Sequence, residues 1–349
     1  MRPWLLLTLG LGLAGCSSGD DGPPLTSATS LACPYPGALP FRLPTSGFEK
    51  SINADTVATE HQSKDQAFDI LGASGGVEAS VGIDDAAAPA MGNTAFAGLK
   101  ARTTPTGGLL ADSLPGEHVS LWFYDEIHTA WQQLGTAVTD DSGRYSIAPS
   151  IGIAFKDGTP FYAMLDADGS CAAAKHYVYP PGTKVVVADI DGTLTTDDNQ
   201  ILMQGADETY VPAMMADADA MTRAWHDRGY PVIYLTARPH LLEAESRAWL
   251  GAKTFADGAL ITQGSSKPAD VYKTLWLQRM ITSFGWQVVA AYGNAQTDIT
   301  AYANVGIDPK QTFIIGPLAG NNGTIAIPDL SYTAHIRDYV MAQPQLTFP

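Results

Sequence analysis

Positive charge and cysteine are both scarce in this chain of 349 residues. It carries 20 Lys and Arg against 36 Asp and Glu, a formal net charge of −16. Proteins that bind nucleic acid, or that dock on anionic lipid through a polybasic patch, need a basic surface, so this composition argues against both. Three cysteines are too few for a disulfide-dense scaffold. The chain is nevertheless 45% apolar, enough to bury a core, and its length indicates one or two domains.

The N-terminus has the pattern of a secretory signal. Arg2 is followed by an apolar stretch at residues 5–13, which is too short to span a bilayer. The residues Leu-Ala-Gly-Cys at 13–16 resemble the bacterial lipobox, which implies a signal peptide of residues 1–15 and lipidation of Cys16. Residues 16–32 are polar and rich in Gly, Pro and Ser, which predicts a flexible tether. We therefore expect a protein of the bacterial cell envelope, lipid-anchored to a membrane and exposed outside the cytoplasm. An ordinary signal with a chance cysteine is the alternative.

Three further segments follow the tether. Residues 33–95 show no clear period, whereas residues 96–181 hold several short alternating segments, which predicts a β-sandwich. Residues 182–349 alternate apolar strand runs with amphipathic helices, which predicts an α/β domain with a doubly wound parallel sheet. In an oxidising compartment Cys33 and Cys171 could form a disulfide; two unrelated thiols are the alternative.

Two carboxylates follow the first apolar strand of the α/β region, where ligands bind in sheets of this kind. Asp189 and Asp191 are separated by one residue and followed by Gly192, which lets the chain turn sharply. One carboxylate could attack phosphorus while the other transfers a proton, and Mg²⁺ would supply countercharge through oxygen ligands. The alternative is a calcium loop, but its twelfth position needs Glu and the chain has Gln200 there.

The residues from 189 to 193, Asp-Ile-Asp-Gly-Thr, resemble motif I of the haloacid-dehalogenase-like (HAD) phosphatases. Residues 232–239 look like motif II of that superfamily, Lys267 like its motif III lysine and residues 292–298 like motif IV. Within the superfamily, residues 225–239 and 293–307 are similar to the catalytic domain of lipins. The later segments 308–316 and 331–335 look like the corresponding domain of the RdgB/Nir phosphatidylinositol-transfer proteins.

The resemblance covers about residues 183–340 and implies a role for each matched residue. Asp189 would be the nucleophile and Asp191 the general acid/base. Mg²⁺ would be held by Asp189, Asp191 and a motif IV group, for which the candidates are Asn294 and Asp298. The phosphoryl group would be held by Thr236, Ala237 and Lys267. Lys273 is the second choice for the lysine, and Arg238 either assists or forms a surface ion pair.

The function that the resemblance implies is Mg²⁺-dependent hydrolysis of a phosphate monoester through an aspartyl-phosphate, with phosphatidate-like lipid as the first substrate to test. A soluble phosphoester is also a possible substrate, because the chain is acidic and its leader places it outside the cytoplasm. The alternative is a non-catalytic module that binds phosphatidate or another lipid, as in the transfer proteins. In those proteins motif I has lost its acids, whereas Asp189 and Asp191 are present here, which favours catalysis. A third interpretation assigns the function to the β-sandwich.

Overall fold

A computed structural model describes residues 61–67, 69–73, 92–99, 111–113, 115–141, 143–147, 155–165, 171–200, 203, 210–264 and 267–349. The predicted signal, the tether, Cys16 and Cys33 lie outside these ranges. Cys171 lies in a described strand, but its side chain is outside the description, so the disulfide stays a prediction. None of the described helices is long and apolar enough to cross a membrane.

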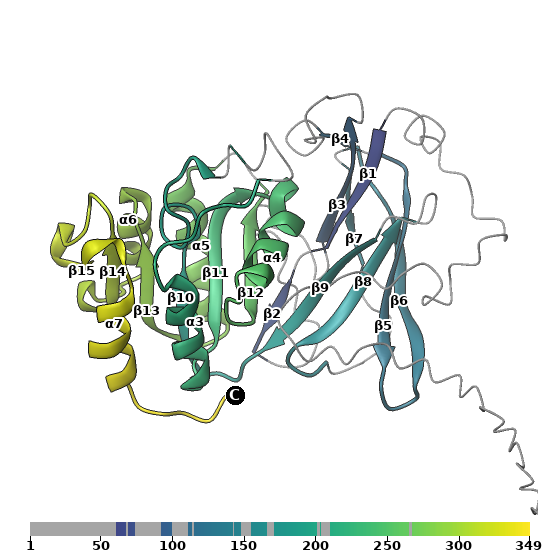
Figure 1. Cartoon of the computed structure of the whole chain (residues 1–349). Helices are drawn as coiled ribbons and strands as arrows, with labels where there is room; N and C mark the ends of the chain where they lie inside the picture. The colour runs from purple at the N-terminus through teal and green to yellow at the C-terminus, as the bar shows by residue number, and fades with distance from the viewer. Residues whose placement is uncertain are drawn as a thin grey trace, which may run out of the picture.

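Residues from 184 onward form an α/β domain around a six-stranded parallel sheet, which confirms the predicted α/β class (Figure 1). The strand order is β12-β11-β10-β13-β14-β15, and every neighbouring pair is parallel. The bounds are β10 Lys184–Ala188, β11 Val232–Pro239, β12 Gly258–Gln263, β13 Gln287–Gly293, β14 Thr312–Ile315 and β15 Ile325–Ile327. Because all six run the same way, their carboxyl ends share one edge of the sheet.

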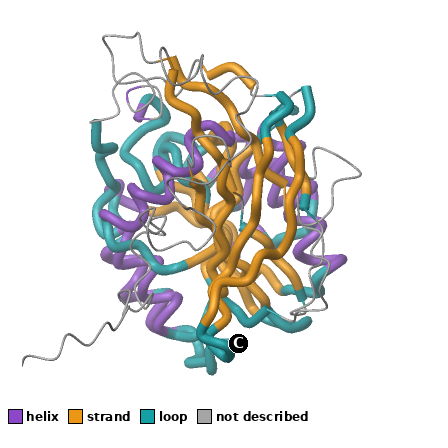
Figure 2. The backbone as a smooth tube through the Cα atoms, turned by 90° about the vertical axis from the view of Figure 1, so that its right-hand side faces the viewer, coloured by secondary structure: helices purple, strands orange, loops and turns teal. Residues whose placement is uncertain are grey.

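Both faces of this sheet are covered by helices, because the strands are apolar on both sides. Val186 and Ala188 pack in a core with the helices α3 and α4, whereas Val185 and Val187 pack in a second core with α5 and α6. Figure 2 looks from the β-domain side and shows helices to either side of the strands. The α-helices are α3 Ala218–Asp227, α4 Glu243–Ala252, α5 Ala269–Gln278, α6 Gln296–Asn304 and α7 Thr333–Asp338. Short helical turns span His240–Leu242, Arg279–Ser283, Pro309–Gln311, Asn321–Gly323, Pro328–Leu330 and Val340–Ala342.

The described residues between 61 and 178 form a β domain of two sheets beside the α/β domain (Figure 1). One sheet has the order β2-β9-β8-β5-β6, and the other joins β1, β3 and β4, with β7 also pairing β3. Tyr145 of the second sheet and Val119 of the first share one apolar core. Two of the strands, and the first half of a third, lie before residue 96, where the sequence shows no clear period. The bounds are β1 His61–Ala67, β2 Ile70–Gly72, β3 Gly92–Leu99, β4 Ala111–Ser113, β5 His118–Asp125, β6 Ala130–Val138, β7 Arg144–Ser146, β8 Thr159–Leu165 and β9 Cys171–Val178.

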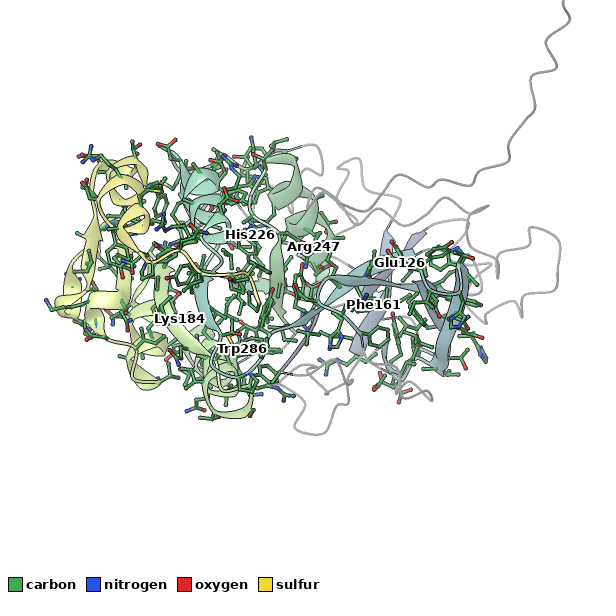
Figure 3. The ribbon with its side chains drawn as sticks, turned by 90° about the horizontal axis from the view of Figure 1, so that it is seen from below. Glu126, Phe161, Lys184, His226, Arg247 and Trp286 are labelled. Atoms are coloured by element: carbon green, nitrogen blue, oxygen red, sulfur yellow. The ribbon has the colours of Figure 1, made fainter. Side chains whose placement is uncertain are left out.

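The β domain covers β12, the edge strand of the parallel sheet. Asp69 is buried, and its carboxylate accepts hydrogen bonds from the backbone N–H of Leu260 in β12 at 2.7 Å and of Lys175 in β9 at 3.0 Å. The same carboxylate pairs with the guanidinium of Arg247, which lies at the junction in Figure 3. Asp257 adds an ion pair with the Lys175 ammonium at 2.6 Å. An edge strand is prone to pair with other chains, so this contact also protects the sheet.

The C-terminal tail is bound along the end of α3, where Gly229 terminates the helix in a left-handed conformation at φ 84°. The backbone N–H of Leu346 donates to the carbonyl of Arg228 at 2.9 Å, and the Tyr230 hydroxyl donates to the carbonyl of Pro344 at 3.0 Å. Further along the tail, the ring of Phe348 lies 6.2 Å from that of Tyr179. The tail therefore links α3 to the chain segment that leaves the β domain.

Gly229 and Gly306 give a matched pair of substitutions, because both follow a helix with a left-handed backbone. A Cβ at Gly229 would lie 2.4 Å from the carbonyl oxygen of Leu346, whereas one at Gly306 would meet nothing within 4 Å. We expect Gly306→Ala to cost about 1 kcal/mol of unfolding free energy through its backbone conformation alone. Gly229→Ala should cost about 1–3 kcal/mol more, because the tail must also move. Urea unfolding of both variants checks this; equal losses would show that the tail does not press on α3.

His176 should make the β domain sensitive to acid. Its ring is 1% exposed, neither nitrogen has a hydrogen-bond partner, and burial lowers its pKa from 6.5 to about 4. The unfolded chain therefore takes up the proton first, so this contribution to stability is present above pH 6.5 and is lost as the pH falls through 4. The loss amounts to about 3 kcal/mol. We expect the free energy of unfolding of His176→Leu to fall less between pH 7 and pH 4 than that of the wild type. Replacement of the exposed His118 should leave the dependence unchanged.

Candidate functional site

The candidate residues of the α/β domain meet at the carboxyl edge of the sheet. Asp189 follows β10, Asn294 follows β13, and the pairing of Ala188 with Tyr234 places Thr236 of β11 alongside residues 189–191. Gly192 allows this convergence: its φ is 67°, and a Cβ there would lie 2.0 Å from the Asn294 amide nitrogen. The left-handed backbone of residue 192 and its lack of a side chain therefore favour the close approach of the loop after β10 to Asn294.

Lys273 is the centre of the site. Its ammonium, buried on α5, lies 2.7 Å from a carboxylate oxygen of Asp189 and 2.6 Å from one of Asp298. Burial raises the pKa of Asp189 to about 7; Lys273 opposes this rise, and the carboxylates of Asp298 and Asp191 add to it. Burial alone would lower the pKa of Lys273, but the two carboxylates outweigh it and raise that pKa. The lysine therefore stays charged, and Asp189 takes up a proton as the pH falls.

The structure brings Lys273 to the carboxylates of the site, and the phosphate-binding role of Lys267 stays a prediction. The structure places Lys267 just before α5, where its backbone carbonyl accepts a hydrogen bond from the Gln263 amide at 2.6 Å. From there α5 rises about 1.5 Å per residue, so a residue six positions later lies roughly 9 Å along the helix axis. Lys273, the second choice, is the lysine that reaches Asp189.

The Asp298 carboxylate contacts Lys273 and two backbone N–H groups. Its side chain is 0% exposed; one oxygen contacts Lys273, and the other accepts the backbone N–H groups of Asn294 and Ala295 at 3.1 Å each. It thereby caps α6 as well as orienting the lysine. Both oxygens of Asp298 thus contact the protein, and its part in a metal site, directly or through water, stays a prediction.

Arg238 forms an ion pair with Asp191, the second acid of motif I. Its guanidinium is fully buried, and it donates from Nη2 to Oδ1 of Asp191 at 2.8 Å and from Nε to Oδ2 at 3.0 Å. Nη1 donates to the Ser246 hydroxyl at 3.0 Å, which in turn donates to the Leu242 carbonyl at 2.6 Å. A bidentate guanidinium–carboxylate pair of this kind fixes both the position and the orientation of the carboxylate. Arg238 is thus a buried partner of Asp191 and not a surface ion pair.

The two remaining phosphate candidates lie between these groups on β11. Thr236 is 0% exposed, and its hydroxyl oxygen accepts the backbone N–H of Arg238 at 3.2 Å. Ala237 is exposed at the same edge. Both residues lie at the carboxyl edge of the sheet, and their roles in phosphate binding stay predictions.

Oxygen atoms that suit Mg²⁺ gather beside Asn294. The Thr193 hydroxyl lies 3.4 Å from Oδ2 of Asp189 and 3.3 Å from the Asn294 side-chain oxygen, and the Asn294 amide donates to Asp198 at 3.0 Å. Hard oxygen donors are the ligands that Mg²⁺ prefers. Among the described residues, however, no group of three or more His, Cys, Asp or Glu side chains is placed to hold a metal ion. Mg²⁺ stays a prediction, with Asp189, Asp191, Asn294 and Asp298 as its candidate ligands.

The fold and this geometry define an α/β protein with a cluster of paired acids and bases, the candidate ligand site, at the carboxyl edge of a parallel sheet. Comparison with known proteins is more specific. Residues 186–316 match the model of the LNS2 domain of PITM 1–3. This range runs from β10 to the residue after β14, so it contains Asp189, Arg238, Lys273 and Asp298.

The curated relatives are named for lipid transfer or for a retinal phenotype. The chain is 32% identical to Protein retinal degeneration B of Drosophila melanogaster over 212 residues, which is 59% of this chain and 16% of that protein. It is 30% identical to the human Membrane-associated phosphatidylinositol transfer protein 1 over 216 residues, which is 60% of this chain and 16% of the relative. The matched part thus spans about a sixth of each relative's length.

These comparisons correct three expectations. The matching family model is that of the LNS2 domain, so the predicted resemblance to the lipin catalytic domain is wrong. The relatives are named as transfer proteins and not as enzymes, which overturns the expected phosphatase. The description of the chain as a magnesium-dependent hydrolase on a lipoprotein receives no support from the same names.

Lys273 and Lys267 allow a direct test of which lysine the site depends on. Lys273→Met would leave two buried carboxylates without a cation, which costs about 3–5 kcal/mol of unfolding free energy. Lys267→Met, at a half-buried position before the helix, should cost less than about 1 kcal/mol. Chemical unfolding at pH 8 and pH 5 measures both. The loss in Lys273→Met should be smaller at pH 5, because burial raises the pKa of Asp189 and this carboxylate then accepts a proton; comparable losses in the two variants would contradict the assignment.

Proposed function

We propose that the α/β domain is a non-catalytic lipid-binding module, which holds the phosphate of a lipid headgroup at the carboxyl edge of its sheet. The observation that carries this proposal is the match of residues 186–316 to the LNS2 domain, together with relatives named as phosphatidylinositol transfer proteins. A HAD-like arrangement of the sheet is part of the proposal, and the helices on both faces are compatible with it.

The geometry of Asp191 supports binding without turnover. A general acid/base must be free to exchange a proton with the reacting oxygen. Here the Asp191 carboxylate is paired through both oxygens with a buried guanidinium, and these hydrogen bonds would have to break before Asp191 could exchange a proton. Ser246 holds the other side of the guanidinium, so the pair cannot separate without leaving a buried charge unpaired.

The polar groups on β11 and α5 support contact with a phosphate. Thr236 supplies a hydroxyl beside the Asp189 loop, and Lys273 supplies the positive charge beneath it. Lysine is a common phosphate partner because it acts as a point charge without a fixed direction. The acidic composition of the whole chain means that long-range attraction to an anionic surface is weak, so affinity would come from these local contacts.

Vesicle co-sedimentation with phosphatidate or phosphatidylinositol tests this function. Thr236→Val, which removes the hydroxyl and keeps the shape, should weaken binding about tenfold, the equivalent of one hydrogen bond. Thr312→Val is the matched control, because Thr312 is also buried but begins β14 at the opposite edge of the sheet. Incubation with phosphatidate and Mg²⁺ should release no phosphate. The proposal would be contradicted if phosphate is released and Asp189→Asn abolishes this release, or if the protein binds none of these lipids.

A further inference from the structure

Most of the exposed apolar side chains of the α/β domain lie at the carboxyl edge of its sheet. Among the described residues of this domain, the large apolar side chains that are exposed are Met203, Val211, Val271, Ile325, Leu330 and Met341. Met203 and Val211 lie in the loop from β10 to α3, and Val271 lies in the first turn of α5, which follows β12. Leu330 lies shortly after the end of β15. Because all the strands are parallel, these loops leave the same edge of the sheet as the candidate site.

These four side chains, which we call the apolar rim, extend across the edge on both sides of the site. Strands β12 and β15 are the outer strands of the sheet, and β10, which carries the Asp189 loop, is a central strand. The other two exposed side chains lie at the opposite edge: Ile325 begins β15, and Met341 lies between α7 and the tail bound at the end of α3. Single exposed apolar residues are common, but a group of them around one site indicates an interaction surface.

The turn that carries Leu330 is attached to the candidate site. Asp329 and Leu330 both have a left-handed backbone, at φ 56° and 51°, which residues with a side chain rarely adopt. The N–H of the next residue but one, Tyr332, donates to the carbonyl of Ala216 at 3.0 Å. The buried hydroxyl of Tyr332 donates to the carbonyl of Thr193, in the Asp189 loop, at 3.0 Å. The protein therefore holds an exposed leucine in a disfavoured conformation at a fixed place beside the site.

The neighbours of Val211 are fixed as well. The side-chain oxygen of the buried Gln200 accepts the N–H of Ala213 at 2.8 Å, and the Trp249 indole donates to the carbonyl of Pro212 at 2.9 Å. Val211 itself is 59% exposed. Its loop is thus bound to the protein through its backbone, and the apolar side chain is left on the surface.

Charge does not draw an anionic surface to this edge. The acids Asp198, Asp217 and Asp329 lie on the same loops as the apolar rim, and the whole chain has a net charge of −16. Lys273 and Arg238 are already paired with carboxylates. Contact with a lipid surface here therefore depends on apolar side chains that enter the boundary between headgroups and acyl chains.

A bilayer is the partner that suits the position of the apolar rim. When the site holds the phosphate of a lipid whose acyl chains stay in the membrane, the edge that carries the site must face the membrane. The rim then lies where the headgroups meet the acyl chains. A protein partner would explain the exposed side chains but not their place on both sides of a headgroup site.

We propose that the apolar rim inserts into the lipid bilayer, so that the carboxyl edge of the sheet is the membrane-contacting face of the protein. This inference rests on the proposed lipid-binding function and adds the surface through which the protein reaches a lipid in its bilayer. Leu330 and Val211 are the most exposed members of the rim, at 52% and 59%. Because the contact is apolar, salt does not weaken it, in contrast to a contact made by a polybasic patch.

Leu330→Asn and Val211→Asn test the rim, with Met341→Asn as the matched control. Leu330 and Met341 are 52% and 53% exposed, at opposite edges of the sheet. Asparagine suits the left-handed backbone at residue 330 better than leucine does, so Leu330→Asn should stay folded. Co-sedimentation of the full chain uses phosphatidylcholine vesicles that contain phosphatidate or phosphatidylinositol. Each rim variant should bind about tenfold more weakly than the wild type, as expected when half an aliphatic side chain is no longer buried, and Met341→Asn should bind like the wild type.

The dihexanoyl forms of the same two lipids separate the rim from the headgroup site. They dissolve as monomers, so binding them requires the headgroup site and no bilayer. Leu330→Asn should bind them like the wild type, whereas Thr236→Val should bind them more weakly. The ratio of wild-type to Leu330→Asn affinity for vesicles should be the same at low and high salt, because the lost contact is apolar.

Several outcomes would overturn the inference and leave the proposed function standing. They are unchanged vesicle binding in the two rim variants, an equal loss in Met341→Asn, a loss of monomer binding in Leu330→Asn, and an affinity ratio that disappears at high salt. A wild type that binds neither the vesicles nor the monomers overturns the function itself.

Discussion

The carboxyl edge of the sheet depends on one ammonium group shared by two buried carboxylates. Lys273 on α5 joins Asp189, which follows β10, to Asp298 on α6, and the second oxygen of Asp298 holds the loop after β13. Three separate elements are thus positioned around a single charge. A buried ion pair gains little stability over apolar packing, because its desolvation offsets its attraction. Its value here is geometric, since any shift of α5 or α6 would leave a carboxylate buried without its partner.

Much of this arrangement is visible in the sequence, and the exceptions have physical reasons. The apolar runs of β10 and β11 predict buried parallel strands, and parallel strands bring Asp189, Thr236 and Asn294 to one edge. The choice between Lys267 and Lys273 is harder, because it depends on where α5 begins and which face it buries. One signal is available: Lys273 lies beside Tyr272 on the apolar stripe of α5, and a lysine on a buried stripe needs an anionic partner. If the helix periodicity is given more weight than the order of the motifs, the sequence therefore favours Lys273 over Lys267.

Other contacts cannot be read from the sequence because they join distant segments. The Arg238–Asp191 pair spans 47 positions and depends on how far β11 projects beyond β10. The contact between Asp69 and the N–H of Leu260 spans 191 positions and depends on the β domain lying against the edge strand β12. No local pattern marks Asp69, which lies in the segment without clear periodicity. Such contacts follow from the packing of completed elements, whereas helix and strand periods follow from local geometry.

The internal pairing of charges bears on how an acidic protein would recognise a lipid. With a net charge of −16 the chain gains nothing from long-range attraction to phosphate, and the cations at its site are neutralised by neighbouring carboxylates. For the proposed lipid site this leaves short-range directional contacts, for which the Thr236 hydroxyl is the candidate, on a framework that charge pairs hold in place. Directional contacts discriminate between ligands better than they attract them. Arg238 and Lys273 therefore act within the protein to orient the carboxylates of Asp191, Asp189 and Asp298.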